Sequence, residues 1–339
     1  MNSRMKLKLI LSFYLFILLK RNISINNIIK FYERNRKNIS YIPVSFSADN
    51  NYLYPLIVLL TSILVNANPK TFYLFYIMIP YNFYNNNKRK IFNLSKKYHN
   101  CKINFYNLGK KYIDWEAKGH YSQTVYYRLS LPDLIKNIDK IIYLDCDTMV
   151  HKDLTELYQI NMKDKYFLGF PSHEVSYLSI NGTRNFINSG VMLINLKLLR
   201  KINSSILFEN YYRAYGTKKV DEYLINVLFY DKISFLPFEY GIPDFERRHK
   251  IIGSPSIFWH KLNGSIINKT KNYVIESSNN RYITHGAYTF KKWWNRKYIS
   301  LTEIGKKWII YASKSNLFNE ICEKYKQYKN VCKKIMKNT

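Results

Sequence analysis

Two aspartates separated by one residue follow a short apolar run near the middle of the chain. Residues 140–144 are rich in β-branched and aromatic side chains, which predicts a buried strand. Asp145 and Asp147 come next, and side chains two apart on an extended backbone point the same way. Both carboxylates can therefore reach one target, and such oxygen ligands at the end of a parallel strand suit Mg²⁺ or Mn²⁺ holding a phosphate-bearing substrate. The acid-x-acid triplet alone is a weak signal, and its weight depends on the residues around it.

The elements that must position these acids alternate along the chain as in an α/β sheet. The pattern predicts strands at 41–47, 71–79 and 102–107, with helices at 53–64 and 85–100 between them. Further along, it predicts helical pieces at 124–131 and 132–137, strands at 186–196, 232–236 and 282–285, and helices at 220–229 and beyond 300. Strand–helix–strand at this rhythm is typical of a mostly parallel sheet with right-handed crossovers and helices on both faces.

Polar segments recur where these predicted strands end or where the next helix begins. In chain order they are residues 48–52, Arg128, Asp145 with Asp147, residues 188–190, Asp221 with Glu222, and His285 followed by Lys291 and Trp293. Ligands of open α/β sheets bind beyond the carboxyl ends of the strands. The spacing therefore predicts one shared site at that edge.

This series of segments resembles glycosyltransferase family 8 over roughly residues 41–295. The most specific parts are residues 126–147 and 186–196, and the closing histidine segment matches in spacing. The resemblance implies a GT-A fold, which is Rossmann-like with a mostly parallel central sheet flanked by helices. It also implies a retaining hexosyltransferase that moves glucose or galactose from a UDP-sugar to a glycan or glycolipid acceptor. In bacterial members that acceptor is lipopolysaccharide or another surface glycan.

The resemblance implies a metal site as well. Asp145, Asp147 and His285 would bind Mn²⁺ or Mg²⁺ across the diphosphate, which offsets charge on the leaving UDP. Lys291 would contact the diphosphate as a point charge. Without the resemblance, His285 would be interpreted as a satisfied core or surface histidine and Lys291 as a solvated surface lysine.

Further residues are assigned to the donor by the same comparison. Ala48, Asp49 and Asn51 match the first nucleotide-contacting loop, although on their own they form an ordinary helix N-cap. Arg128 matches an arginine near the donor, and the alternative is an ion pair on a helix surface.

The sugar and acceptor side of the pocket is implied to include Asn188 and Ser189. Gly190 beside them would permit a close backbone approach. Asp221 and Glu222 are the implied catalytic residues.

Two departures from the family pattern affect the expected mechanism. The usual Asp-Gln-Asp-x-Leu-Asn is here residues 221–226, with Glu222 in place of glutamine and Tyr223 in place of the third acid. Tyr288 and Lys292 replace the usual Gly and Pro after the metal histidine. A carboxylate under the anomeric carbon could act as a nucleophile or could stabilise positive charge there. We favour stabilisation, because family members with glutamine at this position need no nucleophile.

Composition limits the function classes. The chain has 339 residues, a formal charge of +30 and 17% aromatic residues, enough length for one large domain. Such charge attracts anionic membranes, phosphorylated glycans or nucleic acid. A nucleic-acid-binding protein is disfavoured, because the positive charge concentrates at both ends and no common binding module is present. A catalytically idle sugar-nucleotide-binding relative is the other alternative, and the three intact metal ligands argue against it.

The cysteines and the chain ends lead to predictions about location. Four cysteines without CxxC spacing predict free thiols and a reducing compartment. The apolar run 9–19 would reach about 16 Å as a helix, half a bilayer core, and no small-residue cleavage site follows it. A removed signal peptide and a spanning helix are therefore disfavoured, whereas an interfacial anchor, a helix packed on the domain and a poorly ordered tail stay open.

We accordingly expect three parts. Residues 1–38 form a basic and apolar tail or membrane-associating helix, 39–299 the GT-A domain, and 300–339 a basic helical extension. The extension either recruits anionic lipid or is a solvated helix made lysine-rich by compositional bias. The expected location is cytoplasmic, peripheral to the inner face of the cell membrane.

Overall fold

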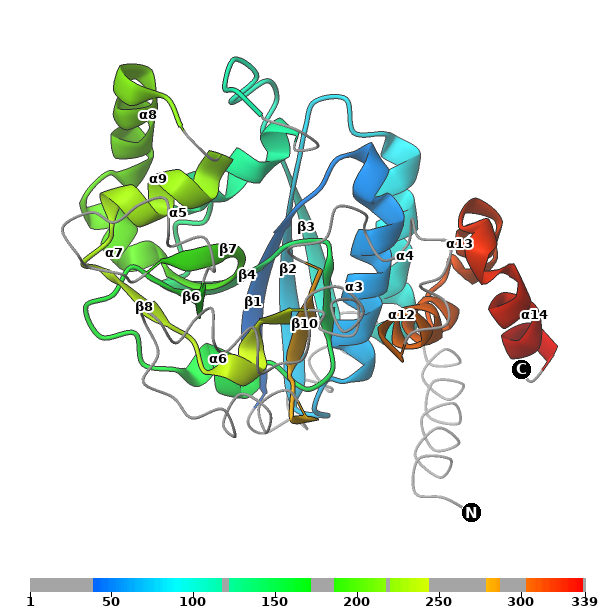
Figure 1. Cartoon of the computed structure of the whole chain (residues 1–339). Coiled ribbons are helices and arrows are strands. Elements are labelled where there is room, and N and C mark those ends of the chain that lie inside the picture. Colours follow the sequence, from blue (N-terminus) through cyan, green and yellow to red (C-terminus); the bar gives the residue numbers. More distant parts are fainter. Residues whose placement is uncertain are drawn as a thin grey trace, which may run out of the picture. The chain divides into compact units, whose positions relative to one another are not determined.

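The structure is a computed structural model in which residues 39–117, 122–171, 186–217, 220–243, 279–286 and 303–337 are described. The chain divides into two compact units at residue 40, and nearly every described residue lies in the second, Tyr41–Thr339 (Figure 1). The tail predicted at 1–38 lies outside the described residues. The division into three parts stays a prediction.

Ten strands are present among the described residues. They are β1 (Ser40–Ser47), β2 (Thr71–Ile79), β3 (Cys101–Asn107), β4 (Lys140–Leu144), β5 (Thr148–Val150), β6 (Phe167–Pro171), β7 (Ile187–Asn195), β8 (Ile233–Phe235), β9 (Ile242–Pro243) and β10 (Ile283–His285). Seven of them form the central sheet in the order β3-β2-β1-β4-β7-β6-β8. β1 pairs in parallel with β4, and β2 with β3, whereas β7 is antiparallel to both of its neighbours, β4 and β6. The mostly parallel α/β fold predicted from the sequence is confirmed.

Helices cover both faces of this sheet (Figure 1). The α-helices are α3 (Leu53–Val65), α4 (Asn85–Tyr98), α5 (Leu131–Leu134), α6 (Thr155–Gln159), α7 (Leu196–Lys201), α8 (Ser204–Tyr215), α9 (Val220–Leu228), α12 (Glu303–Ser313), α13 (Phe318–Lys324) and α14 (Lys329–Lys337). The 3₁₀ helices are η1 (Asn50–Tyr52), η2 (Gln123–Ser130), η4 (Phe238–Tyr240) and η7 (Lys326–Tyr328).

Two hydrophobic cores lie on opposite faces of the sheet, and β4 contributes to both. Ile142 and Leu144 belong to one core, with α3 and α12, whereas Ile141 and Tyr143 belong to the other, with η2 and α9. This alternation is what a strand buried on both faces requires. It also sends Tyr143, two residues before Asp145, to the side of the sheet where η2 and α9 lie.

A second sheet brings a distant segment to the end of β4. β10 lies between β5 and β9, antiparallel to the first and parallel to the second. In this register His285 pairs with Thr148, the residue after Asp147. The Gly286 N–H also donates to the Asp147 carbonyl over 2.7 Å.

The C-terminal helices pack on the outside of α3, one of the helices that cover the central sheet. α12 packs against α3, and Trp308, Ile309 and Ala312 are buried in the α3 core. This packing explains why α3 can be apolar on all of its faces, because such a helix must be buried on every side.

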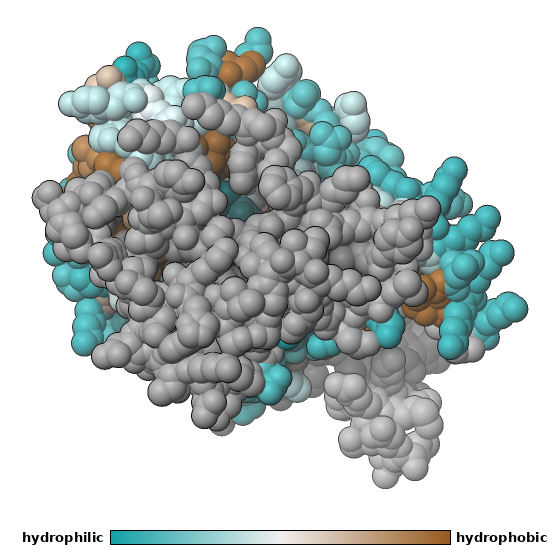
Figure 2. Space-filling view, viewed as in Figure 1, coloured by the Kyte–Doolittle hydropathy of each residue, from teal (hydrophilic) through white to brown (hydrophobic). Residues whose placement is uncertain are grey.

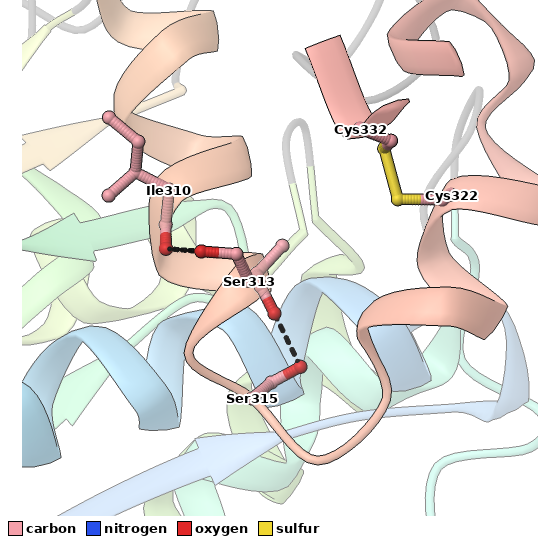
Figure 3. The surroundings of a disulfide bond; sticks show 6 residues. Ile310, Ser313, Ser315, Cys322 and Cys332 are labelled. Atoms are coloured by element: carbon pink, nitrogen blue, oxygen red, sulfur yellow. Dashed lines mark hydrogen bonds between the residues drawn. A yellow bond between two sulfur atoms is a disulfide. The ribbon is translucent and has the colours of Figure 1, made fainter. Parts of the chain in front are cut away.

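A disulfide between Cys322 and Cys332 joins α13 to α14 (Figure 3). The prediction that all four cysteines are free thiols was therefore wrong for this pair. The bridge joins two helices whose cysteines are ten residues apart, a spacing that a search for CxxC does not detect. Cys101 and Cys146 are free and buried.

Candidate metal and donor site

Two carboxylates and one imidazole converge beyond the end of β4. Asp145 follows β4, Asp147 precedes β5 and His285 ends β10. The His285 Nε2 atom lies 3.4 Å from Asp147 Oδ1 and 3.9 Å from Asp145 Oδ2. One ligand atom from each residue lies within 4.8 Å of the others. The cluster assembles because the β5–β10 register places the histidine beside the acids.

Gly190 makes room for this cluster. A Cβ atom built at Gly190 would lie 2.1 Å from His285 Cε1 and 2.7 Å from Asp145 Oδ2, distances that no side chain tolerates. The Gly190 carbonyl meanwhile accepts the Asp145 N–H over 2.8 Å. The close backbone approach predicted at Gly190 is therefore present, and it is an approach to the metal-ligand side chains.

Arg128 is the buried cation of the site. It lies on η2, an eight-residue 3₁₀ helix, which is long for this class of helix. Its Nη2 atom is 2.8 Å from Asp145 Oδ1, and its Nε atom is 3.1 Å from Asp221 Oδ2. Its Nη1 group also donates to the Ser189 carbonyl. The alternative of a surface ion pair is excluded, because the Arg128 side chain is 3% exposed.

The two oxygens of Asp145 have different partners. Oδ1 accepts from Arg128 and, over 3.2 Å, from the Tyr143 hydroxyl, whereas Oδ2 faces His285. The guanidinium of Arg128 lies 4.2 Å from the centre of the Tyr143 ring, a cation–π arrangement. Arg128 and Tyr143 thus fix one oxygen, and the other stays turned toward the cluster.

Asp221 is buried beside Arg128. Burial raises the pKa of the Asp221 carboxyl to about 6, although Arg128 acts in the opposite direction. Burial by itself disfavours the charged form of Arg128, but Asp145 and Asp221 outweigh it and raise the pKa of the guanidinium. Arg128 is therefore the fixed positive charge between these two acids.

Glu222 is held by the start of β7. Its Oε2 atom accepts from Asn188 Nδ2 over 2.8 Å and from the Ser189 N–H over 3.3 Å. The Asn188 Oδ1 atom in turn accepts the Gly190 N–H over 3.0 Å. α9 and β7 thus present the carboxylate, the amide and the glycine as one hydrogen-bonded unit.

The position of residues 188–190 differs from the expectation that each polar segment lies at a carboxyl strand end or opens a helix. They open β7, but β7 is antiparallel to β4, so its beginning lies beside the end of β4. The segment therefore reaches the predicted edge from the opposite chain direction.

The loop after β1 contains the predicted nucleotide-contacting residues. Asp49 caps η1, and its Oδ1 atom accepts the N–H groups of Asn51 and Tyr52 over 2.9 and 3.3 Å. Ala48 is buried and donates its N–H to Met78. Burial raises the pKa of the Tyr52 hydroxyl, and the charges of Asp147, Asp145 and Asp49 raise it further. Tyr52, the last residue of η1, is therefore close enough to the metal-ligand acids to be affected by their charge.

The structure thus brings together most of the predicted site residues. Hydrogen bonds and ion pairs connect Asp145, Arg128, Asp221, Asn188, Ser189 and Glu222, with Asp147 and His285 beside them. Lys291, Trp293, Tyr288 and Lys292 lie outside the described residues. Tyr52, Tyr143 and Asn226 lie inside segments that the sequence analysis named, but it gave none of the three a role of its own. The signal for Tyr143 was its place two residues before Asp145 on a strand, and for Asn226 its place four residues after Glu222 on a helix.

The donor set fits a divalent metal ion. Two carboxylates suit Mg²⁺ or Mn²⁺, and an imidazole shifts the preference toward a transition metal. Gly190 also fits a bound ion, because the side chain of any larger residue would fill the region between His285 and Asp145. The geometry therefore matches a small cation bound by Asp145, Asp147 and His285.

Comparisons with known proteins identify the family and the fold. The sequence model of the protein family described as Glycosyl transferase family 8 matches residues 43–243. General stress protein A of Bacillus subtilis (strain 168) is 28% identical over 123 residues, covering 33% of this chain and 43% of that protein. A putative glycosyltransferase of Haemophilus influenzae is 26% identical over 244 residues, covering 64% and 73%.

Solved structures show the same fold. The bifunctional glycosyltransferase WbbM superposes with a TM-score of 0.66 at 19% identity, covering 84% of this chain and 51% of WbbM. The galactosyltransferase LgtC, in complex with donor and acceptor sugar analogs, gives 0.64 at 19% identity, covering 81% and 96%. The chain therefore spans about half of WbbM, and the match to General stress protein A spans less than half of that protein.

Proposed function

Because the chain belongs to glycosyltransferase family 8, we propose that it is a metal-dependent retaining hexosyltransferase. The donor is a UDP-hexose, glucose or galactose, and the acceptor is a glycan or glycolipid such as lipopolysaccharide or another surface glycan. The observation that carries this proposal is the convergence of Asp145, Asp147 and His285 beyond the end of β4. The description of LgtC as a galactosyltransferase with donor and acceptor sugars supports the choice of donor.

The bound cation would be Mn²⁺ in preference to Mg²⁺, because one of its three ligands is an imidazole nitrogen. When bound, such an ion acts as a Lewis acid that stabilises charge developing on the leaving diphosphate. Arg128 and Tyr143 keep Asp145 Oδ1 occupied, so that Oδ2, which faces His285, is the oxygen that would bind the ion. Ala48, Asp49 and Asn51 position the nucleotide, and Lys291 contributes a positive charge to the diphosphate.

The hexose would lie between the metal-ligand acids and the start of β7. Asn188 and Ser189, which hold Glu222, would face its hydroxyls, and Glu222 provides the negative charge. Asp221 is held behind them by its ion pair with Arg128, which also donates to the Ser189 carbonyl. Positive charge develops at the anomeric carbon as the glycosidic bond breaks. The carboxylate of Glu222, fixed by Asn188 and the Ser189 N–H, stabilises that charge without covalent attack.

The acceptor reaction would occur at a membrane surface. Five lysines of η7 and α14 are exposed: Lys326, Lys329, Lys333, Lys334 and Lys337. Met336, also on α14, is 46% exposed. Figure 2 shows hydrophilic side chains over the C-terminal helices with a hydrophobic patch among them. Basic residues beside an apolar side chain suit anionic headgroups, each near-surface lysine adding about 1 kcal/mol.

We place the chain at the inner face of the cell membrane as a peripheral protein. No helix among the described residues is long and apolar enough to cross a bilayer. The Cys322–Cys332 disulfide bears on this proposal in the opposite direction, because disulfides persist mainly in oxidising compartments. The oxidation state of this pair, fixed by alkylating free thiols in intact cells before lysis, therefore tests the compartment independently of activity.

The test of the donor is a panel of UDP- and GDP-sugars incubated with purified protein, with Mn²⁺ and with EDTA. We expect Mn²⁺-dependent release of UDP from UDP-glucose or UDP-galactose, abolished by EDTA. UDP binding without turnover, with and without candidate acceptors, would favour the idle relative instead. The absence of both UDP binding and sugar turnover would overturn the proposal.

A further inference from the structure

Asn226 lies completely buried between α9 and β7, with 0% of its surface exposed. Its Oδ1 atom accepts the Ile187 N–H over 2.8 Å. Its Nδ2 group donates to the Ile187 carbonyl over 2.8 Å and to the Glu222 carbonyl over 2.7 Å. A side-chain amide offers one acceptor oxygen and two N–H donors, so both donors and one acceptor site are used inside the protein.

This amide replaces a missing strand at the beginning of β7. The pairing of β4 with β7 ends at Leu144 and Val191, followed by the bond between the Asp145 N–H and the Gly190 carbonyl. β7 continues past that point toward Ile187 without β4. On the other side, β6 still pairs Pro171 with Ile187 beyond a register shift between Gly169 and Phe170, so the missing neighbour is on the β4 side only. Asn226 binds both backbone groups of Ile187 as a neighbouring strand would, and thereby satisfies buried groups that would otherwise be costly.

The residues that follow Ile187, the residue bound by Asn226, are those that hold the carboxylate of Glu222. Asn188 and Ser189, immediately after Ile187, donate to Glu222 Oε2. Glu222 lies one helical turn before Asn226, and its own carbonyl is held by the Asn226 amide. The start of β7 and the first turn of α9 are therefore fixed to each other through one buried side chain.

We propose that Asn226 is a positioning residue that sets Glu222 against Asn188 and Ser189 at the sugar end of the site. This inference rests on the proposed function for its catalytic meaning. The geometric part, that Asn226 fixes the Glu222–Ser189 contact, can be tested without turnover. Asn226 acts through backbone groups and touches neither donor nor acceptor.

The test compares Asn226→Asp, which keeps the shape but replaces the NH₂ donor with an oxygen, with Asn226→Ala, which removes the amide. The matched control is Asn195→Ala at the other end of β7, where the Asn195 side chain caps α7 by accepting the Leu198 N–H. Amide hydrogen exchange is followed at Ser189, whose N–H bonds to Glu222 and not to Asn226. Loss of that contact should accelerate exchange about fivefold, because a hydrogen bond contributes roughly 1 kcal/mol.

We expect faster exchange at Ser189 in both Asn226 variants and wild-type exchange there in Asn195→Ala. In the transfer assay, kcat should fall about 10²-fold in the Asn226 variants while the affinity for Mn²⁺ and UDP is unchanged, because the metal ligands lie on other elements. Unchanged exchange at Ser189 in both variants would overturn the inference. Equal losses of sugar transfer and Mn²⁺–UDP affinity would reduce Asn226 to a general structural role. A wild-type protein that turns over no sugar would contradict the proposed function, and the exchange result would still decide the geometric part.

Discussion

The two oxygens of Asp145 connect the ion-pair network of the site with its metal ligands. Oδ1 is bound by Arg128 and Tyr143, and Oδ2 faces His285 across the space that Gly190 leaves open. The orientation of a ligand is usually set by such outer partners, and losing one costs about 10- to 100-fold in metal affinity. The orientation of Asp145 is therefore set by side chains that do not themselves bind the ion.

Gly190→Ala tests the space beside the metal ligands. The added methyl group would overlap His285 and Asp145, so we expect a loss of Mn²⁺ affinity of about 10- to 100-fold, with turnover of the UDP-sugar falling in parallel. Isothermal titration with Mn²⁺ measures the effect. Gly216→Ala is the control, because its positive φ makes the substitution strained while nothing lies within 4 Å of the new atom. Wild-type Mn²⁺ affinity in Gly190→Ala would contradict this role of the glycine.

Glu222→Gln tests charge stabilisation against covalent catalysis. We expect measurable transfer to remain with kcat lowered by about 10²-fold, since the negative charge is lost but no bond to the sugar is required. Steady-state assays with the best donor measure this. Complete loss of turnover would weaken the interpretation. A glycosyl adduct on Glu222, trapped and identified by mass spectrometry of the wild-type protein, would replace it with a nucleophilic mechanism.

At the scale of elements, β10 is tied to the rest of the fold by more than its two strand neighbours. His151, just after β5, contacts Thr284 on β10 through Nε2 over 2.8 Å and Tyr311 on α12 through Nδ1 over 3.1 Å. The Tyr311 hydroxyl also accepts from Asn66 at the end of α3. The strand that contains the metal histidine is thus linked through one imidazole to α12 and α3.

His151 gives stability a pH dependence with a definite sign. Burial lowers the pKa of His151 to about 3, and the charges of Lys307 and Arg281 act in the same direction. The folded state therefore keeps the ring neutral, whereas the unfolded chain takes up a proton below about pH 6.5. Stability is fully present above pH 6.5 and falls toward pH 3 by up to about 1.4 kcal/mol per pH unit.

Denaturant unfolding between pH 7 and pH 4 measures this contribution. His151→Gln should be less stable than wild type at pH 7 but should lose less stability as the pH falls. His99→Gln, at the exposed end of α4, is the control and should keep the wild-type slope. Identical slopes in wild type and His151→Gln would contradict the assignment to this ring.

Some elements could be predicted from the sequence and others could not, for physical reasons. The strand expected at 71–79 is present as Thr71–Ile79, because a long run of alternating aromatic and aliphatic residues has few alternatives. β5 has three residues, too few for periodicity to detect. The direction of β7 was also hidden, because a strand buried on both faces shows no pattern that depends on chain direction.

At the scale of the whole molecule, the site combines segments that are far apart in the chain. The residue types and their order predicted the members of the site, since each lies near the end of an element. The ion pair of Arg128 with Asp221 and the approach of His285 to Asp147 depend on sheet order and strand register, which no local pattern specifies. The disulfide between α13 and α14 depends likewise on the packing of two short helices.

The C-terminal helices give the whole molecule a predicted membrane preference. We expect the protein to sediment with vesicles containing anionic lipid and not with neutral vesicles, and to be released as salt rises, because the lysines of α14 act electrostatically. A variant with Lys333, Lys334 and Lys337 changed to Gln should bind less while retaining turnover of UDP-sugar in solution. A matched control changes Lys88, Lys96 and Lys102, on α4 and β3, to Gln. Equal binding by both variants would exclude α14 as the contact.

The central claim is that Asp145, Asp147 and His285 hold the ion through which a UDP-sugar is bound. The most direct measurement is calorimetric titration of UDP into wild type and Asp147→Asn, with Mn²⁺ and with EDTA. The account predicts UDP binding to wild type that requires Mn²⁺ and is lost in Asp147→Asn, with thermal stability retained. UDP binding of equal affinity in all four titrations, or no binding to wild type with Mn²⁺, would contradict it.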